Sequence, residues 1–246
     1  MKDGRLEGSR QRLPGGGEVC LAWAPSSAVP EGDAWLTPAE AAILDRFRVS
    51  KRAADWRLGR WVAKEAVAWT LRAQADGGSA HELVRAEIEV LAGPGGGPRA
   101  RVLAPGEWPA VAVSLSHSAG TGFAGAVVGA VRLGCDVEEI APRSEEFVSD
   151  YFTAEEAAWI RAGGEEAAPP GGRHVRANLL WSAKESALKA LGEGLRKDTR
   201  SVVVEVGGSS APSASEWRAL SVATAAGERF AGWWRVADGL VWTVVG

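Results

Sequence analysis

A long helical pattern between Lys51 and Ala73 limits the folds that this chain can adopt, because any fold must include one long helix with a buried face. Its apolar residues recur mostly at the three- and four-residue spacing of one helix face, and they are Trp56, Val62, Ala63, Ala66, Val67, Trp69 and Leu71. Asp76-Gly77-Gly78 follows as a stop signal. A shorter helix is predicted before it, because Thr37-Pro38-Ala39-Glu40 combines an N-cap threonine, a proline and a capping-box glutamate. The first half of the chain therefore contains two successive helices.

Strand patterns surround these helices, and the second half of the chain repeats the order. In the first half the predicted strands are 19–23, 88–91, 110–116 and 122–131. The second half has a strand at 135–140, helices at 147–161 and 176–191 separated by a flexible stretch at 163–172, and strands at 202–206, 217–222, 230–236 and 240–245. This order predicts an α+β fold of two similar α+β subdomains joined near Arg132. No strong internal sequence repeat accompanies it.

Three segments follow from this pattern. Residues 1–17 lack apolar periodicity and end in Leu-Pro-Gly-Gly-Gly, so they are predicted to be a flexible leader. The N-terminal subdomain then spans residues 18–131, and the C-terminal subdomain spans residues 132–246.

Charge and cysteine content exclude several classes of protein. Among 246 residues, 28 Lys and Arg stand against 31 Asp and Glu, and the net charge of -3 provides no basic field for nucleic acid. The two cysteines, Cys20 and Cys135, match neither a disulfide framework nor a zinc spacing, which predicts a cytoplasmic protein. Residues 1–17 contain no apolar core segment of the kind a signal peptide needs, and no run approaches the roughly 18 apolar residues of a membrane span, so no membrane partner is expected.

Asp136 and Glu138 are the first candidates for chemistry. They are two residues apart on a predicted strand, where side chains alternate between faces, so both carboxylates share one face. Such a pair can hold Mg²⁺ and leave coordination positions open for a phosphorylated substrate. The alternative is a solvated strand end, since Glu139 is also acidic.

A second set lies in Trp181-Ser182-Ala183-Lys184-Glu185-Ser186-Ala187-Leu188-Lys189, on a predicted helix. Trp181, Glu185 and Lys189 are spaced by four residues and share roughly one face. Glu185 could complete a metal site, and Lys184 and Lys189 could neutralise phosphate. The alternative is an exposed Glu-to-Lys pair worth a few tenths of a kcal/mol.

A hydrolase is disfavoured. Ser114-Leu115-Ser116-His117-Ser118 ends a predicted strand, but residues adjacent in sequence do not readily form a Ser-His nucleophilic pair, and no nucleophile-elbow motif is present.

Taken in order, the motifs resemble the 4′-phosphopantetheinyl transferases, in particular the surfactin-synthetase-activating (Sfp-type) class. The matching segments are SLSHS at 114–118, GCDVE at 134–138, YFTAEE at 151–156 and WSAKESALK at 181–189. A looser match extends through residues 55–60. The resemblance implies a pseudo-dimer of two α+β subdomains with coenzyme A bound between them, and transfer of the phosphopantetheine arm to a serine of an apo acyl or peptidyl carrier protein, which gives 3′,5′-ADP.

The resemblance also implies roles for individual residues. Asp136, Glu138 and Glu185 would bind Mg²⁺, with Mn²⁺ as an alternative, and Glu185 would act as general base for the carrier serine. Lys189 would stabilise or protonate the departing phosphate of 3′,5′-ADP. Lys184 would provide a supporting phosphate contact, and Ser116 and His117 would contact the nucleotide end of coenzyme A.

The N-terminal part departs from the family pattern. Glu40 and Ile43 stand where known members place lysines that hold the 3′-phosphate. Arg52, Arg60 and Lys64 on the next helix, and Arg99 in a Gly-Lys-Pro-like position, are the predicted substitutes, with ordinary surface charge as the alternative.

Two other functions share parts of this pattern. A nonenzymatic module that binds coenzyme A or a carrier protein would have lost a metal ligand or Lys189, yet all are present. A magnesium-dependent nucleotidyl or phosphoryl transferase of unrelated fold would bind ATP rather than coenzyme A. A monomer is expected, since one chain supplies both halves of the implied cleft.

Overall fold

A computed structural model describes residues 5–14, 16–74, 83–162, 172–192, 198–207 and 216–246. The chain divides into two compact units, Met1–Leu133 and Gly134–Gly246. The predicted stop signal at 76–78 and nearly all of the predicted flexible stretch at 163–172 lie outside the described residues. None of the helices in the described part is long and apolar enough to span a bilayer.

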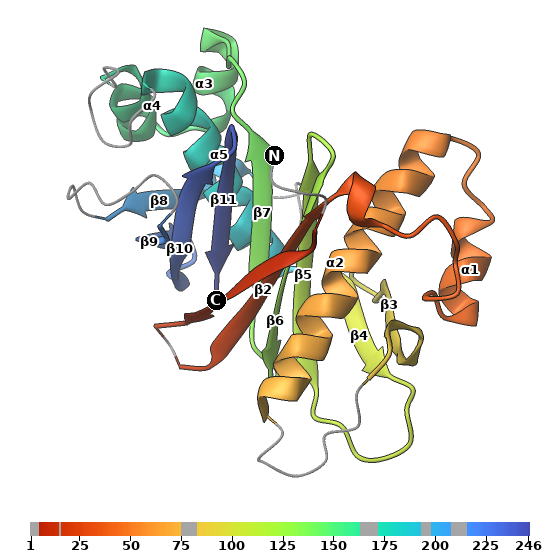
Figure 1. Ribbon diagram of the computed structural model, residues 1–246. Coiled ribbons are helices and arrows are strands. Elements are labelled where there is room, and N and C mark those ends of the chain that lie inside the picture. The colour runs from red at the N-terminus through yellow and green to blue at the C-terminus, as the bar shows by residue number, and fades with distance from the viewer. Residues whose placement is uncertain (1–4, 15, 75–82, 163–171, 193–197, 208–215) are drawn as a thin grey trace. The chain divides into compact units, whose positions relative to one another are not determined.

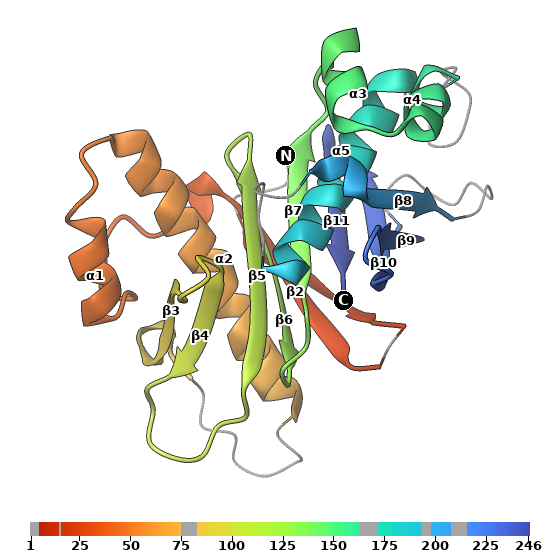
Figure 2. The ribbon, with the colours of Figure 1, turned by 180° about the vertical axis from the view of Figure 1, so that it is seen from behind.

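The N-terminal unit places one long helix against an antiparallel sheet. The sheet has the order β1-β2-β6-β5, and β3 and β4 form a separate two-stranded sheet. The elements are β1 (Glu7–Arg12), β2 (Glu18–Pro25), α1 (Pro38–Leu44), α2 (Ser50–Gln74), β3 (Ile88–Ala92), β4 (Pro98–Val102), β5 (Val111–Ser118) and β6 (Thr121–Val128), with short 3-10 turns at Ser26–Ala28 and Arg85–Glu87. Figures 1 and 2 show α2 running along one face of this sheet. Val62, Ala66 and Val67 of α2 pack there against Ala22 and Ala124.

The prediction of a flexible leader is wrong for residues 7–12. These residues form β1, which pairs antiparallel with β2 from Glu7 opposite Trp23 to Arg12 opposite Glu18. A Cβ on Gly8 would lie 1.7 Å from a ring carbon of Trp69, so the strand passes α2 closely only because glycine stands there. Most β1 side chains are exposed, and backbone hydrogen bonds hold the strand. Apolar periodicity therefore gives no signal for it.

The C-terminal unit also places a long helix against an antiparallel sheet. Its sheet has the order β7-β11-β10-β9-β8, with every pair antiparallel. The elements are β7 (Gly134–Glu139), α3 (Glu145–Tyr151), α4 (Ala154–Arg161), α5 (Gly172–Leu191), β8 (Val202–Val206), β9 (Arg218–Thr224), β10 (Arg229–Ala237) and β11 (Leu240–Val245), with a 3-10 turn at Thr199–Ser201. Figure 2 shows α5 lying along this sheet. In both units the last strand before the helices, β2 or β7, pairs with the last strand of the unit, β6 or β11. The predicted mixture of helices and sheets is confirmed.

The predicted helix at 147–161 is two helices, α3 and α4. Thr153 separates them as the N-cap of α4: its side chain accepts the Glu156 N–H, and the Glu156 carboxylate accepts the Thr153 N–H. Phe152 before it has extended backbone angles and a buried side chain. The chain therefore changes direction at a capping box that lies within a continuous apolar pattern.

Candidate functional site

The close approach of β7 and α5 builds the candidate site of the C-terminal unit. A Cβ on Gly134 would lie 1.7 Å from the carbonyl oxygen of Ser186, so only glycine lets the strand and helix come this near. Ser182 and Ser186 of α5 share hydrogen bonds with the Thr243 hydroxyl, at 2.8 and 2.7 Å. Short side chains thus set the distance between helix and sheet, and the next residues on the same face of β7 meet α5 directly.

Asp136 and Lys189 form the central contact. The Lys189 ammonium donates to Oδ1 of Asp136 at 2.7 Å and to the carbonyl oxygen of Cys135 at 3.1 Å. Asp136 is buried, while the Lys189 side chain keeps 28% of its surface exposed. Between residues 181 and 190 the half-buried positions are Trp181, Glu185 and Lys189, which places them on one face of α5 as the spacing predicts.

Glu138 lies on the same face of β7 and is held from two sides. Its Oε1 accepts the indole N–H of Trp181 at 3.1 Å, and its Oε2 accepts from the Arg143 guanidinium at 3.4 Å. Burial raises the pKa of Glu138, the charge of Asp136 raises it further, and Arg143 and Trp181 oppose both effects.

Glu185 is the most strongly perturbed of these acids. Burial, followed by the negative charges of Asp136 and Glu138, raises its pKa to about 7, against the opposing charge of Lys189. For Lys189, burial lowers the pKa, but Asp136, Cys135 and Glu185 together more than offset it, so the net direction is upward. A carboxyl group that titrates near neutral pH beside a cationic amine has the properties of a general base with a charged neighbour.

The carboxylate cluster, defined as Asp136, Glu138 and Glu185, fits a divalent cation in its chemistry. Asp136 and Glu138 raise the pKa of Glu185, which indicates an excess of negative charge at this place. Carboxylate oxygens are also the donors that Mg²⁺ prefers. They are not set as a ligand sphere. Among the residues that the structure describes, no three His, Cys, Asp or Glu side chains are arranged to hold a metal ion, and Lys189 bonds one oxygen of Asp136. Metal binding would require this pair to rearrange.

Lys184 is not placed to contact phosphate, which corrects the sequence-based assignment. Its side chain is 0% exposed and forms an ion pair with Glu156 at 2.8 Å. The ammonium also donates to the carbonyl oxygens of Thr199, at 2.9 Å, and Val202. Lys184 precedes Glu185 by one residue, which corresponds to a rotation of about 100° around the helix axis. Its side chain therefore points into the core.

The N-terminal unit contains a second cluster of predicted residues, in a pocket of about 250 Å³ between α2 and β5. We call it the α2–β5 pocket. Its lining residues are Phe47, Arg52, Asp55, Trp56, Gly59, Arg60, Leu115 and His117. It brings together Arg52, Arg60 and His117, three residues predicted to contact coenzyme A. Cationic side chains beside aromatic walls are suited to an anionic ligand that carries a ring.

Arg60 is the most constrained cation of the α2–β5 pocket. Its guanidinium stacks over the Trp56 ring at 4.6 Å, and burial lowers its pKa. Its Nε is buried without a hydrogen-bond partner among the described residues. Lys64, one turn further along α2, is fully buried against Glu40 and is not available to a ligand.

Two other predicted contacts lie elsewhere. Ser116 is not among the pocket-lining residues, because it lies between Leu115 and His117 and side chains alternate along β5. Arg99 is exposed on β4, in the separate two-stranded sheet. Neither residue joins the α2–β5 pocket.

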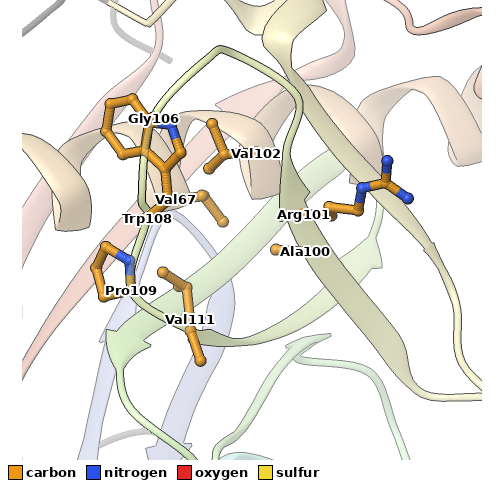
Figure 3. A pocket seen from close by; sticks show the side chains of 9 residues that line it. Val67, Ala100, Arg101, Val102, Gly106, Trp108, Pro109 and Val111 are labelled. Atoms are coloured by element: carbon orange, nitrogen blue, oxygen red, sulfur yellow. The ribbon is translucent and has the colours of Figure 1, made fainter.

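A further pocket of about 320 Å³ lies between α2 and β4, lined by none of the predicted residues. Figure 3 shows Trp108, Val102 and Val67 converging there while Arg101 points away.

Sequence reasoning missed Arg143. It stands in the connection between β7 and α3, where a single arginine carries no signal of its own. Only the path of the chain after β7 brings it back to Glu138.

Comparisons with known proteins concern mainly the C-terminal unit. Residues 132–236 match a family model described as the 4′-phosphopantetheinyl transferase superfamily, the superfamily that the sequence motifs resemble. No curated protein matches the chain. Among solved structures, a holo-(acyl-carrier-protein) synthase from Bacillus anthracis str. Ames in complex with CoA (3′,5′-ADP) is 22% identical, covering 45% of this chain and 93% of its own, with a TM-score of 0.37.

Proposed function

We propose that the protein transfers the 4′-phosphopantetheine group of coenzyme A to a serine of an apo acyl or peptidyl carrier protein, as an enzyme of the surfactin-synthetase-activating class. The observation that carries this proposal is the meeting of Glu185 and Lys189 with Asp136 and Glu138, within the segment that matches the superfamily model. The expected context, a monomer in the cytoplasm, belongs to the same proposal.

The proposed reaction is a displacement at phosphorus. The serine hydroxyl oxygen attacks the phosphorus that carries the pantetheine arm, a P–O bond of the pyrophosphate breaks, and 3′,5′-ADP leaves. Glu185, with a pKa of about 7, takes the hydroxyl proton directly or through water. Lys189 would neutralise charge on the departing phosphate once it releases Asp136.

Asp136, Glu138 and Glu185 would hold Mg²⁺ or Mn²⁺. When bound, the cation would offset charge on the nonbridging oxygens of the pyrophosphate. In the N-terminal unit, Arg52, Arg60 and His117 would bind the nucleotide end of coenzyme A in the α2–β5 pocket. The Arg60 Nε–H is a donor suited to a phosphate oxygen.

Intact-mass spectrometry tests the proposal. An apo carrier protein is incubated with this protein, coenzyme A and Mg²⁺, and a parallel sample contains a chelator. A metal-dependent mass gain of one phosphopantetheinyl group is the expected result. No gain with fatty-acid, polyketide and peptide carriers would refute the transfer reaction and direct attention to binding of coenzyme A alone.

A further inference from the structure

We propose that Arg143 is a positioning residue for Glu138. Together with the indole of Trp181, it holds the Glu138 carboxylate in one orientation within the carboxylate cluster. The inference rests on the proposed function, in which Glu138 is one of the cation-binding acids.

The two hydrogen bonds to Glu138 come to different oxygens. Trp181 Nε1 donates to Oε1 at 3.1 Å, and the Arg143 guanidinium donates to Oε2 at 3.4 Å. Rotation of the carboxylate about its terminal torsion would lengthen both bonds together. Each oxygen accepts one of these two hydrogen bonds and has a second lone pair, so the carboxylate can still bind a further ligand.

Arg143 is itself anchored by buried groups. Its Nε donates to Oδ1 of Asn178 at 2.8 Å, and Asn178 is 0% exposed. The Asn178 amide nitrogen donates to the carbonyl oxygens of Ala141 and His174, both at 2.8 Å, which fixes the orientation of the amide. The backbone N–H of Arg143 also donates to Nδ1 of His174 at 3.4 Å. Core groups of α5 therefore determine where the guanidinium lies.

Phe147 of α3 supports both donors. The Arg143 guanidinium carbon lies 4.7 Å from the centre of the Phe147 ring, and the Trp181 ring packs edge-on against it at 5.2 Å. One aromatic side chain thus restrains the two groups that restrain Glu138. Outer groups that orient a metal-binding carboxylate commonly change metal affinity by about 10- to 100-fold when removed.

The test measures metal binding separately from transfer. Free Mn²⁺ is counted by electron paramagnetic resonance as the full-length protein is titrated, and the Mn²⁺ concentration for half-maximal transfer is measured in parallel. We expect Arg143→Ala to weaken Mn²⁺ binding by about 10- to 100-fold and Trp181→Phe, which keeps an aromatic ring but removes the N–H, by about 10-fold. Arg143→Lys should restore part of the affinity.

The control is Arg161→Ala. Arg161 forms an exposed pair with Glu145 at 2.9 Å in the same region and does not touch Glu138, so Mn²⁺ binding should stay at the wild-type value. At saturating Mn²⁺ the positioning variants should recover a near-wild-type kcat, whereas a merely structural defect would lower kcat without moving the metal requirement.

Each outcome decides between the two proposals. Wild-type Mn²⁺ affinity in a folded Arg143→Ala protein would overturn the positioning role, and if that variant failed to fold, wild-type affinity in a folded Trp181→Phe protein would overturn the two-sided restraint of Glu138. A wild-type protein that binds Mn²⁺ in an Arg143-dependent way but transfers nothing would overturn the transfer function alone. A wild-type protein that neither binds Mn²⁺ nor transfers would overturn both.

Discussion

In the N-terminal unit, Glu40 from the capping box of α1 pairs with Lys64 of α2; in the C-terminal unit, Glu156 from the capping box of α4 pairs with Lys184 of α5. In each unit the other glutamate oxygen accepts a backbone N–H from the strand that follows the long helix, at 2.8 and 3.0 Å. The lysines also donate to backbone carbonyl groups. Each unit therefore contains a buried Glu–Lys ion pair in which both side chains also form hydrogen bonds with the backbone. This pair joins a short helix, a long helix and a strand in each unit.

The sequences of the two long helices match around this pair and then differ. Residues 61–69 read WVAKEAVAW and residues 181–189 read WSAKESALK. The last position is Trp69 in one unit and Lys189 in the other. The strands that pack against these helices also differ. In the N-terminal unit, Ala22 of β2 packs in the apolar core, whereas in the C-terminal unit Asp136 of β7 accepts a hydrogen bond from Lys189 of α5. The comparison teaches that the shared lysine holds the fold in each unit, whereas the unshared Lys189 and Asp136 bring additional charge to the candidate site.

Even the shared glutamate has a different surrounding. Glu65 pairs with Arg85, whose guanidinium neutralises it. Glu185 is surrounded by the charges of Asp136 and Glu138, and its pKa is about 7. One residue type in one helical position is thus a paired ion in the first unit and a candidate base in the second.

The largest expected difference between the units is in activity. Glu185→Gln should slow phosphopantetheine transfer by about 10²- to 10⁴-fold, since removal of a general base has an effect of this size. Glu65→Gln should leave the rate near wild type. Carrier mass shift against time measures both, and equal losses in the two variants would contradict the division of roles.

The buried lysines should instead behave alike. Lys64→Met and Lys184→Met each leave a buried glutamate without its cationic partner. Each should therefore reduce the free energy of unfolding by about 3–5 kcal/mol. Urea denaturation followed by tryptophan fluorescence gives the value. Lys51→Met, which removes an exposed pair with Asp55, is the matched control with an effect below about 1 kcal/mol. A Lys184→Met protein of wild-type stability with weakened binding of coenzyme A would restore the phosphate role for Lys184.

The pH dependence of stability separates the two glutamates further. Because the folded state raises the Glu185 pKa from 4.5 to about 7, the protonated form favours folding, and this stabilisation is present below about pH 4.5 and lost as pH rises through 7. Glu185→Gln keeps a neutral side chain throughout. At pH 8 with a chelator present, the free energy of unfolding of Glu185→Gln should therefore exceed that of wild type by about 2–3 kcal/mol. This difference should become small near pH 5.

Glu65→Gln should show the opposite sign at pH 8, because it breaks the pair with Arg85. Thermal denaturation at pH 5 and pH 8 measures both differences. A Glu185→Gln protein less stable than wild type at pH 8 would mean that Glu185 is stabilised as an anion.

The smallest expected effects are at the helix caps. Thr37→Ala and Thr153→Ala each remove the side-chain oxygen that accepts an N–H at the start of a helix, which should cost about 1 kcal/mol. Chemical denaturation of each variant provides the measurement. A much larger loss for one of them would show that its cap also positions the glutamate of the buried pair.

Local signals in the sequence predicted much of the fold. The cap at Thr37 predicted α1, and apolar spacing predicted α2 and α5 to within a few residues. The same cap pattern at Thr153 was present, but the apolar residues on both sides of it read as one helix. The strand β1 escaped because it lies at a sheet edge with polar, exposed side chains.

The candidate site was predictable where periodicity alone determines it. Period-two and period-four spacing placed Asp136 with Glu138 and Glu185 with Lys189. Spacing does not say which side of a helix is covered, so Lys184 was assigned to a phosphate although it lies in the core. The Arg143 contact depends on the course of a connection and on Asn178 of a distant helix, and no local pattern encodes that.

Gly134 shows how a residue without a side chain determines where charges lie. Since even one added carbon would collide with Ser186 of α5, any replacement must push the strand away from the helix. The 2.7 Å contact between Lys189 and Asp136, two residues further along β7, would open with it. A residue that bears no functional group thus determines the distance between Lys189 and Asp136. An alanine at position 134 would weaken this ion pair although every ionisable residue would still be present.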